Sequence, residues 1–294
     1  MPDKATNSSH HVVPPIALRR RIVDRLMTGA AVLTVIIVLA PLFAIFAYLV
    51  YRGFGSINWA FLTQTPKPVG ESGGGMANAI VGSILILGIA SIIGVPTGVG
   101  AGIYLAEFGR NRFGDAIRFT ADVLNGVPSI VVGIVAYAIV VLSQRHFSAL
   151  AGGVALAIMM VPTITRTTEE MLLLVPRALR EAAYGLGVPR WRTTLSITLR
   201  TATSGVITGI MLAFARVAGE TAPLLFTAFG NQFWNLKINE PTAALPLQIF
   251  TYAISPYDEW HRQAWAGALV LILLIVTAVA AVRIAVRRGT FGAA

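Results

Sequence analysis

The chain has 294 residues, of which 55% are hydrophobic and 12% are charged, and its mean hydropathy is +0.73. Soluble domains carry about 25% charged residues, so this composition excludes a soluble globular protein. The net charge of +10 stands in short clusters between long apolar runs. It forms no single basic stripe, and we therefore expect no nucleic acid partner. The expected surroundings are a lipid bilayer.

Long apolar runs predict an all-α membrane protein. About six spans of ~20 residues are expected, at 27–50, 78–105, 121–142, 150–165, 204–225 and 264–285. The first run has 24 residues without a charge, longer than the apolar core of a signal peptide, which has about 7–15 residues. We thus expect a basic tail (1–26), a transmembrane domain (27–285) and a second tail (286–294).

The distribution of basic residues predicts the orientation. Six crossings put both termini on one side, and the segments on that side hold 17 Lys and Arg, whereas the opposite loops hold 5. Basic residues favour the cytoplasmic side. Both termini and the segment 166–203 are therefore expected in the cytoplasm.

Small residues recur every fourth position in two of the spans. They are Gly94, Gly98 and Gly102, and then Gly205, Gly209 and Ala213. Small residues at this spacing let helix backbones approach closely. We expect these faces to pack inside the chain.

The segment 166–203 predicts a helix-turn-helix. Leu179, Ala182, Ala183 and Leu186 recur at helical spacing, and Gly187 suits the position after the end of a helix. A second helix is expected from Pro189, with Trp191 and Leu195 on it. The apolar face is rimmed by Arg177, Arg180, Glu181, Arg190 and Arg192. It suits either insertion into a groove of a partner protein or contact with anionic lipid.

Two charged residues fall inside the fifth predicted span. Arg216 is its thirteenth residue, which places it near the middle of the bilayer, and Glu220 follows one turn later. Such a costly charge must face protein or water. We expect the two side chains to neutralise each other when no solute is bound, and the Arg216 guanidinium to exchange the carboxylate for a phosphate group. The alternative is a fixed structural ion pair.

A second charged cluster ends the fourth predicted span. Arg166 has Glu169 and Glu170 at helical spacing, which fits either a gate in a solute pathway or the stabilisation of a helix at the membrane surface. Asp122 and Asn125 are expected to be boundary and capping residues of the third span. Pro128 is expected to kink that span.

Chemical motifs are few. None of the three lysines follows a glycine, which excludes a phosphate-binding P-loop. The four histidines show no metal-binding spacing and cysteine is absent. We expect no catalytic residue, no metal site and no cofactor in this chain.

The segment 166–203 resembles a motif of a known family. Glu181-Ala182-Ala183, Gly187, Ile197 and Leu199 resemble the EAA loop of binding-protein-dependent ABC importer permeases, although Arg200 stands where that family usually has proline. The resemblance implies a type I ABC importer permease fold with a cytoplasmic coupling loop (about 176–200) between helices 4 and 5. Glu181, Ala182, Ala183 and Gly187 are then ATPase-coupling residues. A separate ATPase subunit binds ATP and Mg²⁺.

Further segments resemble the A-type subunits of the phosphate branch of this family. They are Gly74-Gly75-Met76-Ala77-Asn78-Ala79-Ile80, Gly126-Val127-Pro128-Ser129-Ile130-Val131-Val132-Gly133, Arg166-Thr167-Thr168-Glu169-Glu170, Arg216-Val217-Ala218-Gly219-Glu220-Thr221-Ala222-Pro223-Leu224-Leu225 and Leu245-Pro246-Leu247-Gln248-Ile249-Phe250. This implies a phosphate importer permease in the cell membrane. Its implied partners are a homologous C-type permease, two copies of the ATPase and an extracytoplasmic phosphate-binding protein. Arg216, Glu220, Arg166 and Glu169 are the candidates for the translocation pathway.

Two other classes of protein remain open from the residues. One is an ion-coupled secondary anion transporter that uses Glu220 as a proton site, and the other is a membrane scaffold that recruits a partner through 166–203. A secondary carrier has no need of an ATPase-docking helix. A scaffold has no reason to bury charges in lipid.

Overall fold

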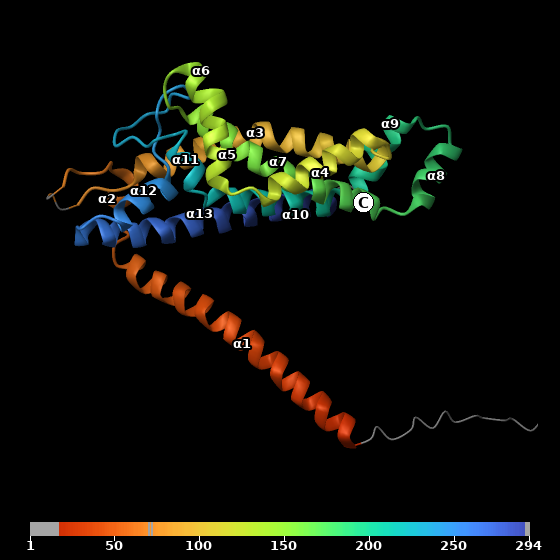
Figure 1. Ribbon diagram of the computed structural model, residues 1–294, viewed down its shortest axis with the longest axis horizontal. Coiled ribbons are helices and arrows are strands. Elements are labelled where there is room, and N and C mark those ends of the chain that lie inside the picture. The colour runs from red at the N-terminus through yellow and green to blue at the C-terminus, as the bar shows by residue number, and fades with distance from the viewer. Residues whose placement is uncertain (1–17, 70, 72, 292–294) are drawn as a thin grey trace, which may run out of the picture. The chain divides into compact units, whose positions relative to one another are not determined.

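The computed structural model describes residues 18–69, 71 and 73–291. They fall into two compact units, which divide between Val50 and Tyr51. The described residues are helices and loops with one isolated bridge between Phe229 and Thr242. The all-α prediction is confirmed for this part of the chain (Figure 1).

The described part of the first unit is residues 18–50 of helix α1 (Leu18–Phe54), which contains Pro41, and the last four residues of this helix belong to the second unit. Its apolar stretch has a hydropathy of 2.8 and satisfies the length requirement for a membrane span. The predicted span 27–50 lies inside it. The helix begins earlier than 27, so the basic residues Arg20, Arg21 and Arg25 are on its first turns. Residues 1–17 of the expected N-terminal tail lie outside the described residues.

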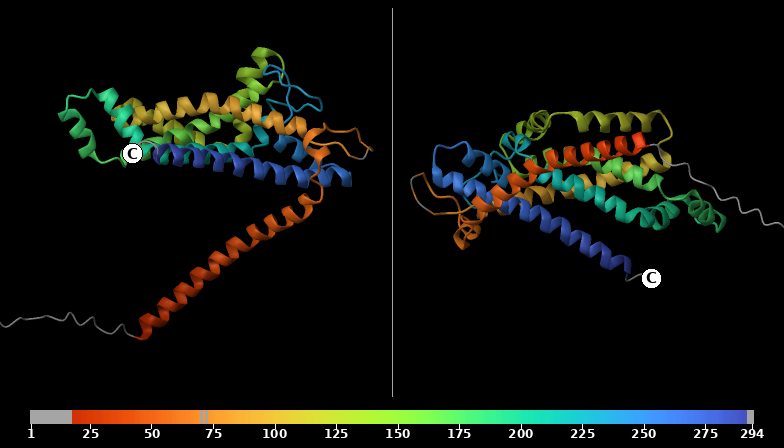
Figure 2. Two further views of the ribbon diagram at one scale, coloured as in Figure 1. Left: turned by 180° about the vertical axis from the view of Figure 1, so that it is seen from behind. Right: turned by 90° about the horizontal axis from the view of Figure 1, so that it is seen from below.

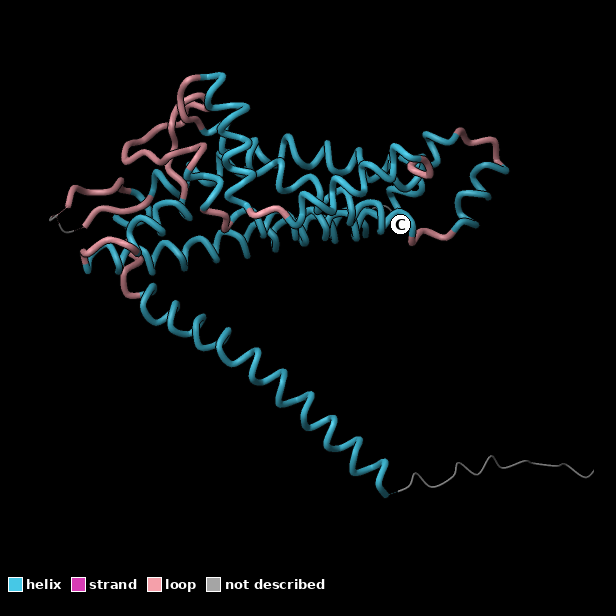
Figure 3. Tube along the Cα trace, viewed as in Figure 1, coloured by secondary structure: helices cyan, strands magenta, loops and turns pink. Residues whose placement is uncertain are grey.

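The second unit holds the other helices. In chain order these are α2 (Trp59–Thr63), α3 (Ala77–Phe108), α4 (Arg112–Gly126), α5 (Ser129–Ala136), the π-helix η1 (Tyr137–Val141), α6 (Leu142–Gln144), α7 (Ala149–Leu173), α8 (Arg177–Gly185), α9 (Arg190–Thr193), the π-helix η2 (Thr194–Thr198), α10 (Leu199–Ala218), α11 (Ala222–Leu225), α12 (Leu245–Ala253) and α13 (Asp258–Phe291). The described residues contain five helices that can cross a membrane, or six if the bent pair α4 and α5 counts as one span. The longer loops gather at the end of this unit opposite α8 (Figure 3).

The third predicted span is broken into two halves. Helix α4 ends at Gly126, and the next helix begins at Ser129 at an angle of 109° to it. Val127 and Pro128 are both extended, with ψ of 133° and 135°. A proline disfavours helical geometry at the residue before it. The predicted kink at Pro128 is therefore a complete break.

The fourth and fifth spans differ from their predicted bounds. Helix α7 has 25 residues, so the fourth span is of ordinary length. The fifth runs over Arg190–Ala218, and the predicted second helix of the cytoplasmic helix-turn-helix is in fact its first part. It ends before Gly219 and α11 follows. The prediction of 204–225 was wrong because the ring of Pro223 would clash with the Gly219 carbonyl in a continuous helix.

The core of the second unit is the contact between α3 and α7. A Cβ atom built on Gly98 would lie 2.7 Å from Cβ of Ile164, and one on Gly102 would lie 2.5 Å from Cβ of Thr168. Ile164 belongs to a buried apolar cluster that also includes Ile86 of α3 and Val217 of α10. The glycine face packs inside the chain as predicted. Helices α3, α7 and α10 run side by side (Figure 2).

This contact predicts different outcomes for two glycines of one helix. Gly98→Ala should destabilise the protein by about 1–3 kcal/mol, because the methyl group must push α7 away. Gly100→Ala is the matched control, since nothing lies within 4 Å of its Cβ position. Thermal unfolding of the purified protein in detergent checks the difference. Equal melting temperatures for the two variants would show that the helices do not approach this closely.

Candidate functional site

Charged side chains of α4 and α7 form a connected cluster. Arg166 holds Asp122 with two hydrogen bonds, from Nε to Oδ1 at 2.8 Å and from Nη2 to Oδ2 at 2.7 Å. Its Nη1 also donates to Oε2 of Glu169 at 3.2 Å. A guanidinium fork on a carboxylate combines charge with fixed geometry. The pair therefore sets the position of α4 relative to α7.

Glu169 is the centre of this cluster. Its side chain is only 5% exposed, and its other oxygen accepts a hydrogen bond from Nε of Arg118 at 2.7 Å. The carboxylate thus lies between the guanidinium groups of Arg118 and Arg166. A buried carboxylate needs such partners, because an isolated buried charge is very costly.

Arg118 also binds the C-terminal end of α3. Its Nη1 donates to the carbonyl of Gly109 at 2.8 Å and to Asp115 at 3.0 Å, and its Nη2 donates to the carbonyl of Leu105 at 3.2 Å. A cation is favourable at the carbonyl end of a helix. One side chain of α4 therefore fixes the ends of both α3 and α7.

Sequence reasoning located this cluster only in part. Arg166 and Glu169 were singled out, but Arg118 was missed, and Asp122 was assigned to a boundary role. Asn125 accepts a hydrogen bond from Thr163 instead of capping a helix. The missed signal was the i, i+4 spacing of Arg118 and Asp122, which puts both on one face of α4.

The predicted pair of Arg216 and Glu220 is not formed. Arg216 is the third residue from the end of the Arg190–Ala218 run, and Glu220 lies beyond that end. The two are therefore not one helical turn apart. Among the described residues neither side chain has an ion-pair or hydrogen-bond partner, and Arg216 is exposed. The prediction failed because it rested on a helix continuing through Gly219.

Helix α8 is the predicted amphipathic helix, and it projects from one end of the second unit (Figure 1). Gly187 follows it with φ of +79°, and two hydrogen bonds complete the cap, from the Val188 amide to the Ala183 carbonyl and from the Gly187 amide to the Tyr184 carbonyl. This is the geometry of a glycine-terminated helix. The prediction that Gly187 lies just past the end of this helix is confirmed.

The exposed face of α8 includes two residues of the EAA motif. Glu181 and Ala182 are exposed, whereas Ala183 is buried. Leu186, after the helix, is 84% exposed. Arg180, predicted at the rim, turns inward to Glu107 of α3. The face therefore keeps an apolar surface on which bulky side chains, Leu186 among them, are exposed.

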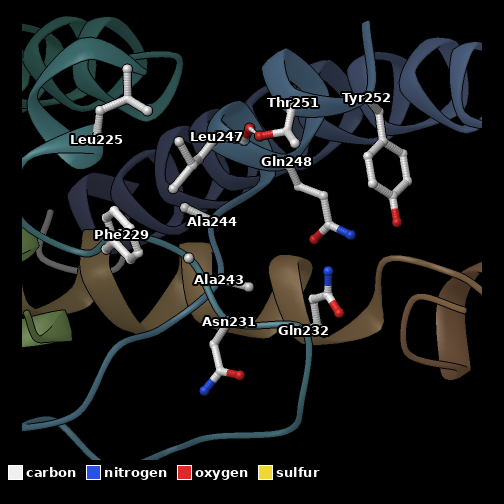
Figure 4. A pocket seen from close by; sticks show the side chains of 11 residues that line it. Leu225, Phe229, Asn231, Gln232, Ala243, Ala244, Leu247, Gln248, Thr251 and Tyr252 are labelled. Carbon is white, nitrogen blue, oxygen red and sulfur yellow. Dashed lines mark hydrogen bonds between the residues drawn. The ribbon is translucent and has the colours of Figure 1, made fainter. Parts of the chain in front are cut away.

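A cavity of about 290 Å³ lies between α12 and the loop after α11. Figure 4 shows the side chains of Gln232, Gln248 and Tyr252 at it. No charged residue lines it, so it offers an anion no ionic partner. Among the residues that the structure describes, no three His, Asp or Glu side chains gather into a metal-binding group.

A bundle of apolar helices with a small amphipathic helix at one end is the architecture of a membrane permease domain. Solved structures support that class for the fold. Two chains of the MetNI methionine ABC transporter align with TM-scores of 0.56 and 0.54 at 17% and 18% identity, over 72% of this chain and 97% and 94% of theirs.

The sequence comparisons give the family. Residues 98–289 match the model of the binding-protein-dependent transport system inner membrane component. The phosphate transport system permease protein PstA of Yersinia pestis is 51% identical over 77% of both chains, and that of Haemophilus influenzae is 46% identical over 87% of this chain and 91% of its own. This chain therefore belongs to the family of binding-protein-dependent inner membrane transport components, in the PstA group.

The cluster predicts that two adjacent glutamates differ in their effect on stability. Glu169→Gln leaves two guanidinium groups around a neutral amide, which should cost about 3 kcal/mol and lower the melting temperature by on the order of 6–12 °C. Glu170→Gln is the control, because Glu170 is exposed and its side chain has no ion pair among the described residues. Thermal unfolding in detergent provides the comparison. Similar melting temperatures for both variants would mean that the cluster is not a stabilising network.

The cap of α8 gives a second prediction at this site. Gly187→Val must hold a β-branched residue at positive φ, a strain of about 1–2 kcal/mol. Nothing lies within 4 Å of the Cβ position, so the strain should distort the end of α8 while the protein stays in the membrane. ATPase association or its stimulation by binding protein should fall. Unchanged stimulation would favour an α8 that only lies on lipid.

Proposed function

We propose that this chain is the permease subunit of an ATP-driven inorganic phosphate importer. It would form part of the translocation pathway in the cell membrane and carry no catalytic site of its own. The observation that carries the proposal is the identity of 46–51% with relatives named as phosphate transport system permeases. A relative from Mycobacterium tuberculosis with the same kind of name is 36% identical over 90% of this chain.

The proposed assembly has several other components. They are a homologous C-type permease, two copies of an ATPase that binds ATP and Mg²⁺, and an extracytoplasmic phosphate-binding protein. The exposed face of α8, with Glu181 and Ala182, suits a groove on the ATPase. This helix also favours the importer over an ion-coupled secondary anion transporter or a scaffold.

The proposed pathway residues are Arg216 and Glu220, with Arg166 and Glu169 as a second pair. Arg216 is exposed and has no ionic partner among the described residues, so its guanidinium fork is available to a phosphate oxyanion. Arg166 is already held by Asp122 and Glu169. We therefore assign solute binding to Arg216 and a gating role to Arg166 and Glu169.

Reconstitution tests the function. The chain is co-expressed with its neighbouring reading frames, and the membrane complex is purified and placed in liposomes with ATP. Labelled phosphate should accumulate only when ATP and binding protein are both present. Uptake driven by a proton gradient without ATP would instead indicate a secondary transporter.

The proposed orientation puts both termini and α8 in the cytoplasm. The chain has no cysteine, so single introduced cysteines report each position cleanly. An impermeant thiol reagent added to intact cells should label position 235 in the loop before α12 and spare position 184 on α8. The reverse pattern would invert the topology.

Substitution of Arg216 should reduce phosphate uptake and leave the stability of the protein unchanged. Arg216→Gln removes a charge that has no partner among the described residues, so the free energy of unfolding should change by no more than about 0.5 kcal/mol, as is typical of surface changes. Labelled phosphate uptake should fall by about tenfold or more, since the phosphate loses a positively charged hydrogen-bond donor of the protein. Arg110→Gln serves as a control, because Arg110 is also exposed and has no ionic partner among the described residues. Normal uptake by Arg216→Gln would remove this residue from the pathway.

A further inference from the structure

One side chain of α8 reaches into the helix bundle. Nη1 of Arg180 lies 2.9 Å from Oε1 of Glu107, and its Nη2 donates a hydrogen bond to the carbonyl of Leu172 at 2.7 Å. Glu107 is in the last turn of α3 and Leu172 is in the last turn of α7. Within the described part of the chain, no other α8 side chain makes an ion pair or a hydrogen bond.

The ion pair is shielded from water. The side chains of Arg180 and Glu107 are 17% and 10% exposed. Charges in such a place interact strongly, and removing one partner leaves the other uncompensated. The guanidinium donates a hydrogen bond to the Leu172 carbonyl, whereas its contact with Glu107 is an ion pair without hydrogen-bond geometry. Arg180 therefore couples the position of α8 to the ends of two long helices.

Two arginines thus hold the last turn of α3. Arg118 of α4 binds the carbonyls of Leu105 and Gly109, and Arg180 of α8 binds the carboxylate of Glu107, which lies between them in the sequence. Arg118 also binds Glu169 of α7. A displacement of α8 can therefore pass through the end of α3 to the Glu169 cluster without a gap in the chain of contacts.

The packing of α3 on α7 makes this route stiff. Gly98 and Gly102 bring the two backbones together over the half of α3 that leads to Glu107. Close-packed helices transmit displacement because their interiors compress little. By contrast, α8 itself is short, since it begins after Pro176 and ends before Gly187. Helix α8 is thus a separate short segment. Among the described residues, Arg180 makes its side-chain ion pair to α3 and its side-chain hydrogen bond to α7.

We propose that the Arg180–Glu107 ion pair is the link through which the movement of α8 reaches the α3, α4 and α7 helices, with both residues acting as positioning residues for coupling. The inference rests on the proposed function, since it requires an ATPase bound at α8. The ion pair stays formed throughout the transport cycle and keeps α8 at a fixed distance from the end of α3. Its loss should separate ATP hydrolysis from transport.

The test measures phosphate taken up per ATP hydrolysed by the complete transporter in liposomes. Glu107→Gln and Arg180→Gln should retain the ATPase subunits and their hydrolysis, but uptake per ATP should fall by about fivefold or more. Arg177→Gln is the matched control, because Arg177 is an exposed arginine of the same helix. It should leave the ratio unchanged. A residue needed only for folding would lower assembly and leave the ratio of the surviving complexes intact.

Exchange of the two charges gives a second, independent variant. Arg180→Glu combined with Glu107→Arg should recover part of the ratio, whereas each single reversal should not. Loss of the ATPase subunits on Arg180→Gln would overturn the inference, since Arg180 would then be a docking residue. An unchanged ratio in the assembled single variants would also overturn it. A wild-type complex that takes up no phosphate with ATP would instead refute the proposed function, which keeps the two failures distinct.

Discussion

The close approach of α3 and α7 is the constraint on which the rest of the second unit depends. Three glycines, Gly94, Gly98 and Gly102, let α3 lie against Met160, Ile164 and Thr168 of α7. In a bilayer no hydrophobic force drives helices together, so tight van der Waals packing of small residues must supply the stabilisation. Because the two helices keep one register along this contact, the end of α3 with Glu107 and the region of α7 with Glu169 lie within reach of the same arginine, Arg118.

Charge pairing sorts the ionic residues of the chain into two kinds. Arg118, Arg166 and Arg180 each hold a carboxylate, and Glu169 and Glu107 are the most shielded members of these pairs. Such pairs keep helix ends in place at little net cost because each charge is compensated. Arg216 is of the second kind, as Arg110 is, since it is exposed and has no ionic partner among the described residues. We propose that the transported solute supplies the charge that compensates Arg216.

Hydropathy predicted the spanning segments well, because the length of an apolar run follows directly from bilayer thickness. The cap at Gly187 was also predictable, since few other residues adopt positive φ easily. Sequence reasoning failed where the chain breaks inside an apolar run, at Val127-Pro128 and at Gly219. Hydropathy carries no signal for the direction of a helix; Pro128 was expected only to kink its span, and Pro223 was given no effect on the helix. Asp122 and Arg180 were assigned to boundary and rim roles because their partners, Arg166 and Glu107, are distant in the sequence and meet only in the fold.

We propose that α8, α3, α7 and α4 move as one rigid block. Spin labels on Tyr184 of α8 and Val123 of α4, both on exposed positions, can be introduced cleanly because the chain has no cysteine. Pulsed electron paramagnetic resonance would then measure the distance between the labels in the assembled complex, without nucleotide and with trapped ATP. We expect one narrow distribution that shifts by less than about 2 Å, the scale of small helix adjustments. A larger shift, or two distances that exchange with nucleotide, would contradict a rigid link between α8 and the ion-pair cluster.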